Sequence, residues 1–231
     1  SHIYMGNWAK SELNKHPKSK TFILDFLREA DFNIVDFTNT ETPINYPESA
    51  QGFIGQFNKY ISRELGRNEQ ERQEYQKNYE LINKSVFDLE LTHRVIQDDD
   101  TSSDYQLEEE LQSAGTHRLL MLAVLLYQIF ETKGIAYFDE IESSLHPYLL
   151  YYFIRRFLEN ESPTQLIVTT HYDPLLTQTS WIDKDLFWFT EKRKDGSTDL
   201  YSLSEFKGLK RINIQKAYLS GNFGALPEID Y

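Results

Sequence analysis

The chain has 231 residues, of which 40% are hydrophobic, and these totals favour a globular protein with one large domain or two small ones. The formal net charge of −12 weakens the case for a protein that grips nucleic-acid phosphates, although it leaves DNA open as a partner. The absence of cysteine excludes disulfides and thiolate metal sites, and no apolar run approaches the roughly 20 residues of a membrane-spanning helix. We therefore expect a cytoplasmic protein with no membrane partner.

The beginning of the chain predicts a helix, a strand and a loop. An amphipathic pattern ends near Ala30, and an alternating strand follows over residues 34–37. Residues 38–49 are rich in Pro, Asn and Thr and predict a loop. Because the sequence does not begin with Met, and Ser1-His2 resembles the remnant of a tag, we expect a piece of something longer.

The middle of the chain contains a polar segment and then a hairpin. Residues 57–84 are helix-forming and very polar, which favours a solvated helical excursion. A nucleic-acid-binding or coiled-coil element is the alternative, but apolar heptads are not sustained. Two strands at 86–95 and 105–111 bracket the acidic turn 96–104 and predict a β-hairpin.

A change of pattern follows this hairpin. Residues 113–134 form a helix that is apolar nearly all round, with Ser113 as its N-cap and Gly134 closing it, so we expect deep burial. A strand at 135–138, a helix at 146–161 and a strand at 165–171 then predict a right-handed parallel crossover. Functional groups gather at the carboxyl ends of such strands.

The last quarter predicts a short helix, a hairpin and a docked tail. The short helix lies around residues 174–178. Aromatic residues at period two and an Asp-Gly turn at 195–196 predict a hairpin over 185–206. Glycines and a proline among apolar residues in 217–231 favour a tail that packs on the body of the protein.

Two acids, Asp139 and Glu140, end the strand "IAYF" in the stretch "GIAYFDEIESSLHP". A nucleotide hydrolase needs such a pair, because one carboxylate holds Mg²⁺ and the other orients or deprotonates the attacking water. Neighbouring residues at a strand end point to opposite sides unless the chain turns at once, and here a turn follows. An ordinary strand ending in exposed acids is the alternative.

Two further features suit a phosphate ligand. His171 ends the next strand, where it could donate a hydrogen bond to a terminal phosphate, or could be purely structural. The stretch "SAGT", residues 113–116, opens the apolar helix with free backbone N–H groups, and Gly115 permits close approach of a ligand. A simple N-cap followed by a small residue is the alternative for that stretch.

Together these motifs resemble a known family. The order Ser-Ala-Gly-Thr, apolar helix, apolar strand ending Asp-Glu, Ser-Leu-His-Pro, and apolar strand ending Thr-His is similar to the second half of an ABC-type ATPase head. More narrowly, the chain resembles the AAA-labelled ABC-like ATPases of bacterial abortive-infection and anti-phage systems, relatives of the OLD, RecF and SMC groups. The resemblance covers residues 107–231, and "LYSLSEF" and "AYLSGNFGALPEI" extend it to the closing segments.

The resemblance implies an α/β fold with the parallel-sheet core of a P-loop NTPase, in which this chain supplies the C-terminal half. Residues 1–106 would be a partial head segment with the helical excursion and the first hairpin, and residues 107–231 the ATPase core with the terminal hairpin. ATP and Mg²⁺ are the implied cofactors. The implied partners are a second ATPase head, in a homodimer or higher oligomer, and an effector such as a nuclease or toxin subunit.

The resemblance also assigns roles to individual residues. In the Walker B motif, Asp139 would associate with Mg²⁺ and Glu140 would be the general base or would orient the water, while His171 would be the switch histidine that reads the γ-phosphate. The remaining residues would meet ATP or the neighbouring subunit: Ser113, Gly115 and Thr116 of the signature motif, and Ser143, Ser144 and His146 of the D-loop. The signature departs from Leu-Ser-Gly-Gly, so its phosphate contacts are less closely defined.

The sequence contains no Gly-x-x-x-x-Gly-Lys-[Ser/Thr] loop, whose backbone N–H groups and lysine hold the β- and γ-phosphates. We therefore expect the chain to be inactive alone and that loop to lie in a truncated segment or another chain. Three functions stay open: an ATPase head that controls a defence effector, a RecF- or SMC-like DNA-maintenance ATPase, and a non-catalytic scaffold. No separate constellation of acids indicates a nuclease.

Overall fold

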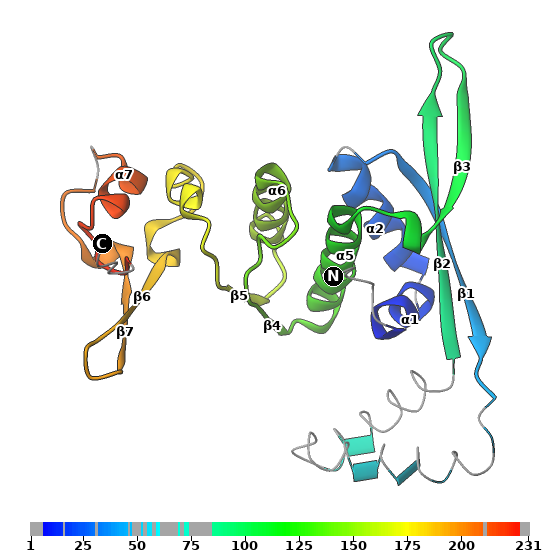
Figure 1. Ribbon diagram of the computed structural model, residues 1–231, viewed down its shortest axis with the longest axis horizontal. Helices are drawn as coiled ribbons and strands as arrows, with labels where there is room; N and C mark the ends of the chain where they lie inside the picture. Colours follow the sequence, from blue (N-terminus) through cyan, green and yellow to red (C-terminus); the bar gives the residue numbers. More distant parts are fainter. Residues whose placement is uncertain are drawn as a thin grey trace. The chain divides into compact units, whose positions relative to one another are not determined.

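The computed structural model describes residues 7–15, 17–30, 32–45, 47, 85–209 and 212–226, with isolated helical positions between 52 and 73. The chain divides into two compact units (Figure 1). The first comprises residues 1–138 and 143–167, and the second comprises residues 139–142 and 168–231. The predicted boundary near residue 107 stays a prediction.

The first unit combines helices with a three-stranded antiparallel sheet and a two-stranded sheet, with strand orders β1-β2-β3 and β4-β5. Its helices are α1 (Asn7–Lys15), α2 (Pro17–Glu29), the 3₁₀ turn η1 (Glu109–Leu111), α5 (Ala114–Thr132) and α6 (Pro147–Leu158). Its strands are β1 (Ile34–Pro43), β2 (Ser85–Ile96), β3 (Ser102–Glu108), β4 (Ile135–Phe138) and β5 (Gln165–Val168), whose last residue belongs to the second unit.

The apolar helix α5 forms the centre of the first unit, as its sequence predicts. Nine of its residues are buried, and α2 packs along it with the ring of Phe22 edge-on to Phe130 at 6.0 Å between centroids. The helix begins where expected, since Ser113 is the N-cap. The prediction gave the closing position to Gly134. In the structure the helix ends at Thr132 and Lys133 is the C-cap, with a left-handed backbone (φ 53°), one residue before Gly134.

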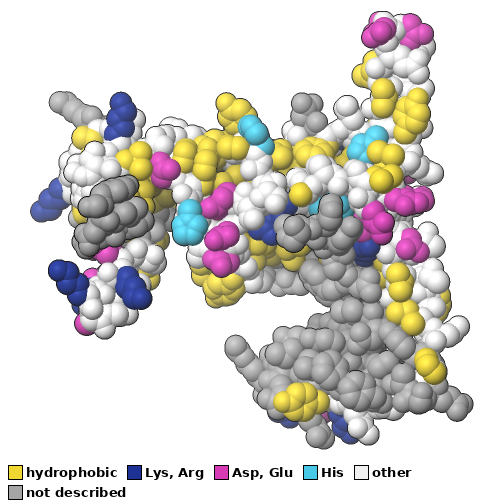
Figure 2. Space-filling view, viewed as in Figure 1, with side chains coloured by type: hydrophobic (Ala, Val, Ile, Leu, Met, Phe, Trp, Pro, Cys, Tyr) yellow, Lys and Arg dark blue, Asp and Glu magenta, His cyan; other side chains and the backbone are white. Residues whose placement is uncertain are grey.

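The predicted first hairpin is confirmed as β2 and β3, in the register Leu91 opposite Leu107. Two boundaries were wrong. The predicted loop at 38–49 begins with strand, because β1 continues to Pro43 by pairing with β2 as far as Ser85. Residues 109–111 form the 3₁₀ turn η1 instead of strand. Acidic side chains gather at the tip of this hairpin (Figure 2), where Asp98, Asp99 and Asp100 form the turn.

The strands β4 and β5 are parallel neighbours, as predicted, joined through α6. The backbone N–H of Gln165 donates to the carbonyl of Gly134 at their beginnings (3.1 Å), and that of Ile141 donates to the carbonyl of Thr169 just beyond their ends (3.2 Å). The second strand is shorter than expected and ends at Val168. The carboxyl ends of both strands therefore come together where the predicted functional residues follow.

The second unit contains the predicted short helix and terminal hairpin. Its strands are β6 (Trp188–Lys192) and β7 (Thr198–Ser202), its α-helix is α7 (Ile214–Leu219), and its 3₁₀ turns are η2 (Asp173–Thr177), η3 (Lys184–Leu186) and η4 (Leu203–Glu205). Basic side chains gather at the turn of this hairpin (Figure 2), which includes Lys192, Arg193 and Lys194.

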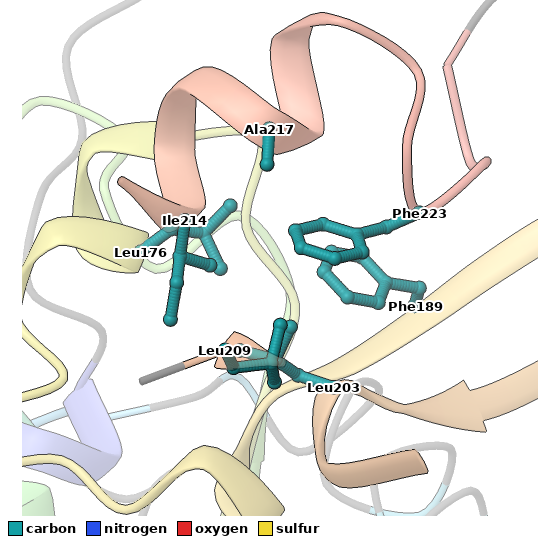
Figure 3. Packing of buried hydrophobic residues seen from close by; sticks show 7 residues of the cluster. All are labelled: Leu176, Phe189, Leu203, Leu209, Ile214, Ala217 and Phe223. Carbon is teal, nitrogen blue, oxygen red and sulfur yellow. The ribbon is translucent and has the colours of Figure 1, made fainter. Parts of the chain in front are cut away.

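A small apolar core holds the second unit together (Figure 3). The rings of Phe189 and Phe223 stack with centroids 5.9 Å apart. The closing segment packs here through Ala225, as the prediction of a docked tail requires. Residues 227–231 lie outside the described part. A Cβ atom at Gly224 (φ +68°) would come within 2.7 Å of the Tyr201 hydroxyl, so this approach of the tail requires glycine.

The predicted helical excursion at 57–84 lies largely outside the described residues, and the described positions within it, 59–60, 69 and 72–73, are helical. Within the part of the chain that the structure describes, no helix combines the length and apolar character needed to cross a membrane.

Candidate functional site

The chain turns sharply at the two acids that follow β4. Glu140 has φ +47°, in the left-handed region, which a residue without glycine's freedom enters at a cost of about 1 kcal/mol. This turn lets the neighbouring side chains of Asp139 and Glu140 leave the strand end without pointing to opposite sides. Both residues are exposed, as a site for a diffusing ligand requires.

Thr169 joins these acids to the end of β5. Its hydroxyl donates to Oδ1 of Asp139 and accepts the backbone N–H of Glu140 at 3.0 Å. The backbone carbonyl of Thr169 also accepts from Ile141. The sequence-based prediction gave this threonine no role. The available signal was its hydroxyl one residue beyond the end of β5, the strand that neighbours β4 and its acid pair.

His171 lies beside Glu140, as predicted. Its Nε2 atom is 3.7 Å from Oε1 of Glu140, and its side chain is 87% exposed. The backbone N–H of His171 donates to Oε1 of Glu142 at 2.7 Å. The structure thus brings Asp139, Glu140 and His171 together at one edge of the parallel strands, and adds Glu142, which the sequence analysis did not identify.

The carboxyl group of Glu142 is held as a hydrogen-bond acceptor. Burial raises its pKa, but hydrogen bonds from Thr170, from its own backbone N–H and from the backbone N–H of His171 outweigh burial, so the pKa of Glu142 lies below its usual value. The Oε2 atom is shielded from solvent. Glu142 is therefore less suited to act as a base than the exposed Glu140.

The stretch Ser113–Thr116 opens α5 in the first unit as a hydrogen-bonded cap. The Ser113 hydroxyl accepts the backbone N–H of Thr116 at 3.1 Å, and the two hydroxyls are 2.8 Å apart. If the Thr116 hydroxyl donates to Ser113, the proton of Ser113 is free for a phosphate oxygen. Thr116 is buried, so its side chain supports the cap, and direct contact with phosphate stays a prediction for it.

The predicted signature and D-loop residues approach each other within the first unit. A Cβ atom at Gly115 would lie 3.4 Å from the backbone carbonyl of Ser144, which itself has a left-handed backbone (φ +62°). Ser143 and Ser144 are exposed. His146 is also exposed, and its Nδ1 accepts the backbone N–H of Tyr148 at 3.3 Å, so it caps α6.

A buried ionic cluster anchors the turn that precedes the signature. Glu109, 5% exposed, pairs with Lys10 of α1, and its Oε1 atom lies 3.5 Å from Nδ1 of His117 on the first turn of α5. The pair of Glu109 with Lys10 connects residues about a hundred positions apart in the sequence, so no local pattern identifies it. These contacts hold η1 against the helix that presents Ser113.

Removal of the Ser113 hydroxyl should test the cap separately from any ligand contact. We expect Ser113→Ala to lower the free energy of unfolding by about 1 kcal/mol, because it removes the side-chain acceptor at the N-cap. Asn at position 113 keeps an acceptor and should keep most of the stability. Urea unfolding followed by circular dichroism measures both, and equal losses for the two variants would contradict the capping role.

Within the described residues, no group of three or more histidine and acidic side chains is placed to hold a metal ion. Asp139 nevertheless fits the single-carboxylate attachment by which proteins hold Mg²⁺ against phosphates and water. It is exposed, and Thr169 fixes its position. This single carboxylate is therefore compatible with Mg²⁺ whose other ligands come from a nucleotide and water.

Comparison with known proteins gives one family match. Residues 19–177, more than half of the chain, match the family described as "AAA domain, putative AbiEii toxin, Type IV TA system". No curated protein matches the chain. A solved structure from work described as "Structural biochemistry of ATP-driven dimerization and DNA stimulated activation of SMC ATPases" is similar, with 21% identity and a TM-score of 0.37 over 51% of this chain. The chain spans 65% of the length of that structure.

Proposed function

The chain belongs to the family of AAA domains described as putative AbiEii toxins of type IV toxin–antitoxin systems, and we propose that it is the hydrolytic half of an ATP-driven head. The observation that carries this proposal is the meeting of Asp139, Glu140 and His171 at the carboxyl ends of β4 and β5. Parallel strands collect nucleotide-binding groups at this edge.

In the proposed mechanism, the residues of the second unit act by position and charge. Asp139 would hold Mg²⁺, which, when bound, neutralises phosphate charge. The exposed carboxylate of Glu140 would accept the proton of the attacking water or orient it. His171, next to Glu140, would donate a hydrogen bond to the terminal phosphate. The hydrogen bonds of Thr169 would hold Asp139 and the backbone of Glu140 in place before ATP arrives.

The residues of the first unit would serve ATP held by a second head. With Thr116 as the donor to Ser113, the cap would leave the Ser113 hydroxyl proton for a phosphate oxygen, and the start of α5 offers the positive end of its dipole. Gly115 and Thr116 support this end of the helix. We propose that Ser143, Ser144 and His146, all exposed, face the same neighbour, so that two heads close on ATP.

The glycine-lysine loop that this mechanism requires would come from a segment outside the sequence. Support comes from one face of the β4–β5 pair, where the side chains of Ile135, Tyr137 and Ile167 are 54%, 71% and 49% exposed. In a folded protein, apolar residues at alternating positions of a strand are usually covered by another layer of structure. We propose that the part of the head that carries the loop packs on this face.

The purpose of ATP turnover would be control of a toxin-type effector in defence. The family description supports that reading, since it names a putative toxin of a toxin–antitoxin system. A DNA-maintenance ATPase is the alternative, but the hairpin tip at Asp98, Asp99 and Asp100 is acidic and would repel a phosphate backbone. A scaffold would need none of the three site residues.

The test is ATP hydrolysis by the complete protein, with its phosphate-binding segment and Mg²⁺. We expect Asp139→Asn to reduce phosphate release by about a hundredfold or more, because the amide still accepts from Thr169 but lacks the charge that holds Mg²⁺. Asp98→Ala, at an exposed aspartate of the hairpin turn, is the matched control and should keep the rate. A wild-type rate in Asp139→Asn would exclude the proposed role.

A further inference from the structure

Glu142 makes the contact that reaches from the acid turn to the backbone of His171. Its Oε1 atom accepts the backbone N–H of His171 at 2.7 Å, and its Oε2 atom is shielded from solvent. The hydroxyl of the neighbouring Thr170 accepts the backbone N–H of Tyr172 at 3.0 Å, which orders the same segment. The hydrogen bond that Oε1 of Glu142 accepts therefore goes to the backbone that carries His171.

The imidazole of His171 has little packing of its own to hold it. Its side chain is 87% exposed, and its Nε2 atom lies 3.7 Å from Oε1 of Glu140, whose side chain is itself 60% exposed. Two exposed side chains in water restrain each other weakly. The position of the ring must therefore come mainly from the backbone on which it stands.

We propose that Glu142 is a positioning residue for the reaction, which fixes the backbone at His171 and so places the imidazole beside Glu140. This inference rests on the proposed function, because it concerns the same site. Glu142 does not replace Glu140 as base, since its oxygens are occupied or shielded and its geometry directs it to the backbone. Instead, it couples the segment after β4 to the segment after β5.

The first test compares two variants in the complete protein. Glu142→Ala removes the acceptor and should lower kcat for ATP hydrolysis by about tenfold to a hundredfold, the range of a hydrogen bond to a charged group, with KM for ATP within about twofold. Glu142→Gln keeps an acceptor for the His171 N–H and should restore most of kcat. Because both variants remove the charge, their difference isolates the hydrogen bond. Equal losses would overturn the proposal.

A double-mutant cycle tests whether Glu142 acts through His171. In a His171→Ala background, Glu142→Ala should cost about twofold or less in kcat, because the imidazole that it positions is already missing. The full loss in that background would show a role independent of His171 and would overturn the proposal.

A third measurement requires no nucleotide. The amide of His171 should exchange with solvent about tenfold faster in Glu142→Ala than in the wild type, and at nearly the wild-type rate in Glu142→Gln. Unchanged exchange in Glu142→Ala would overturn the proposed anchoring. Because this measurement does not depend on ATP hydrolysis, it separates failure of the positioning from failure of the proposed function.

Discussion

Glu140→Gln should leave ATP binding by the complete protein within about twofold and reduce hydrolysis by about 10²- to 10⁴-fold, the usual contribution of a general base. An amide is nearly the same size as a carboxylate but cannot accept a proton from water at neutral pH. Glu140 is 60% exposed and its backbone N–H already donates to Thr169, so the substitution should leave the fold unchanged.

Two measurements are needed for this variant. Equilibrium binding of a fluorescent ATP analogue reports affinity, and phosphate release under single-turnover conditions reports the chemical step. Glu161→Gln, at an exposed glutamate in the loop between α6 and β5, serves as the control and should match the wild type in both. Wild-type phosphate release in Glu140→Gln would contradict the assignment, because water activation would then depend on another group.

The second large effect concerns stability. Phe153→Ala should lower the free energy of unfolding of the first unit by about 3–5 kcal/mol, the range for truncating a buried aromatic residue. The Phe153 side chain is fully buried on α6, and its ring meets that of Phe138 at 79° with centroids 6.0 Å apart. Phe138 is the last residue of β4, so the cavity would remove packing from the end of that strand.

Chemical denaturation of the complete protein, followed by circular dichroism, measures this loss. Leu158→Ala on the same helix is the matched control, because Leu158 is 41% exposed and its truncation should cost less than about 1 kcal/mol. A shift for Phe153→Ala no larger than that of the control would mean that α6 does not support β4 in the way its packing indicates.

Local patterns in the sequence predicted the elements around the site well. The apolar run of α5, the cap at Ser113 and the strand before Asp139 depend on neighbours within a few residues, and each is confirmed. The strand before His171 is also present, although it ends at Val168 instead of at His171. The meeting of Asp139, Glu140 and His171 was also predictable, because parallel strands joined by one helix place their ends together.

The errors concern interactions between distant residues. Strand β1 continues through Thr38–Pro43, whose composition is that of a loop, because β2 offers hydrogen-bond partners more than forty positions later. The roles of Thr169 and Glu142 depend on which atoms face each other across two loops, which periodicity cannot show. The pairing of Glu109 with Lys10 is hidden for the same reason.

The hairpin of β2 and β3 also bears on how the protein behaves at high concentration. β3 is an edge strand of its sheet, and the nearby side chains of Val95, Ile96 and Tyr105 are 46%, 71% and 51% exposed. Such an edge invites a strand from another molecule to add to the sheet. The ion pair of Arg94 with Asp104 joins β2 to β3, and the three aspartates of the turn place like charges at the tip of the hairpin. Repulsion between those tips opposes such pairing, so part of the excess negative charge disfavours strand addition at this edge without affecting contacts through other surfaces.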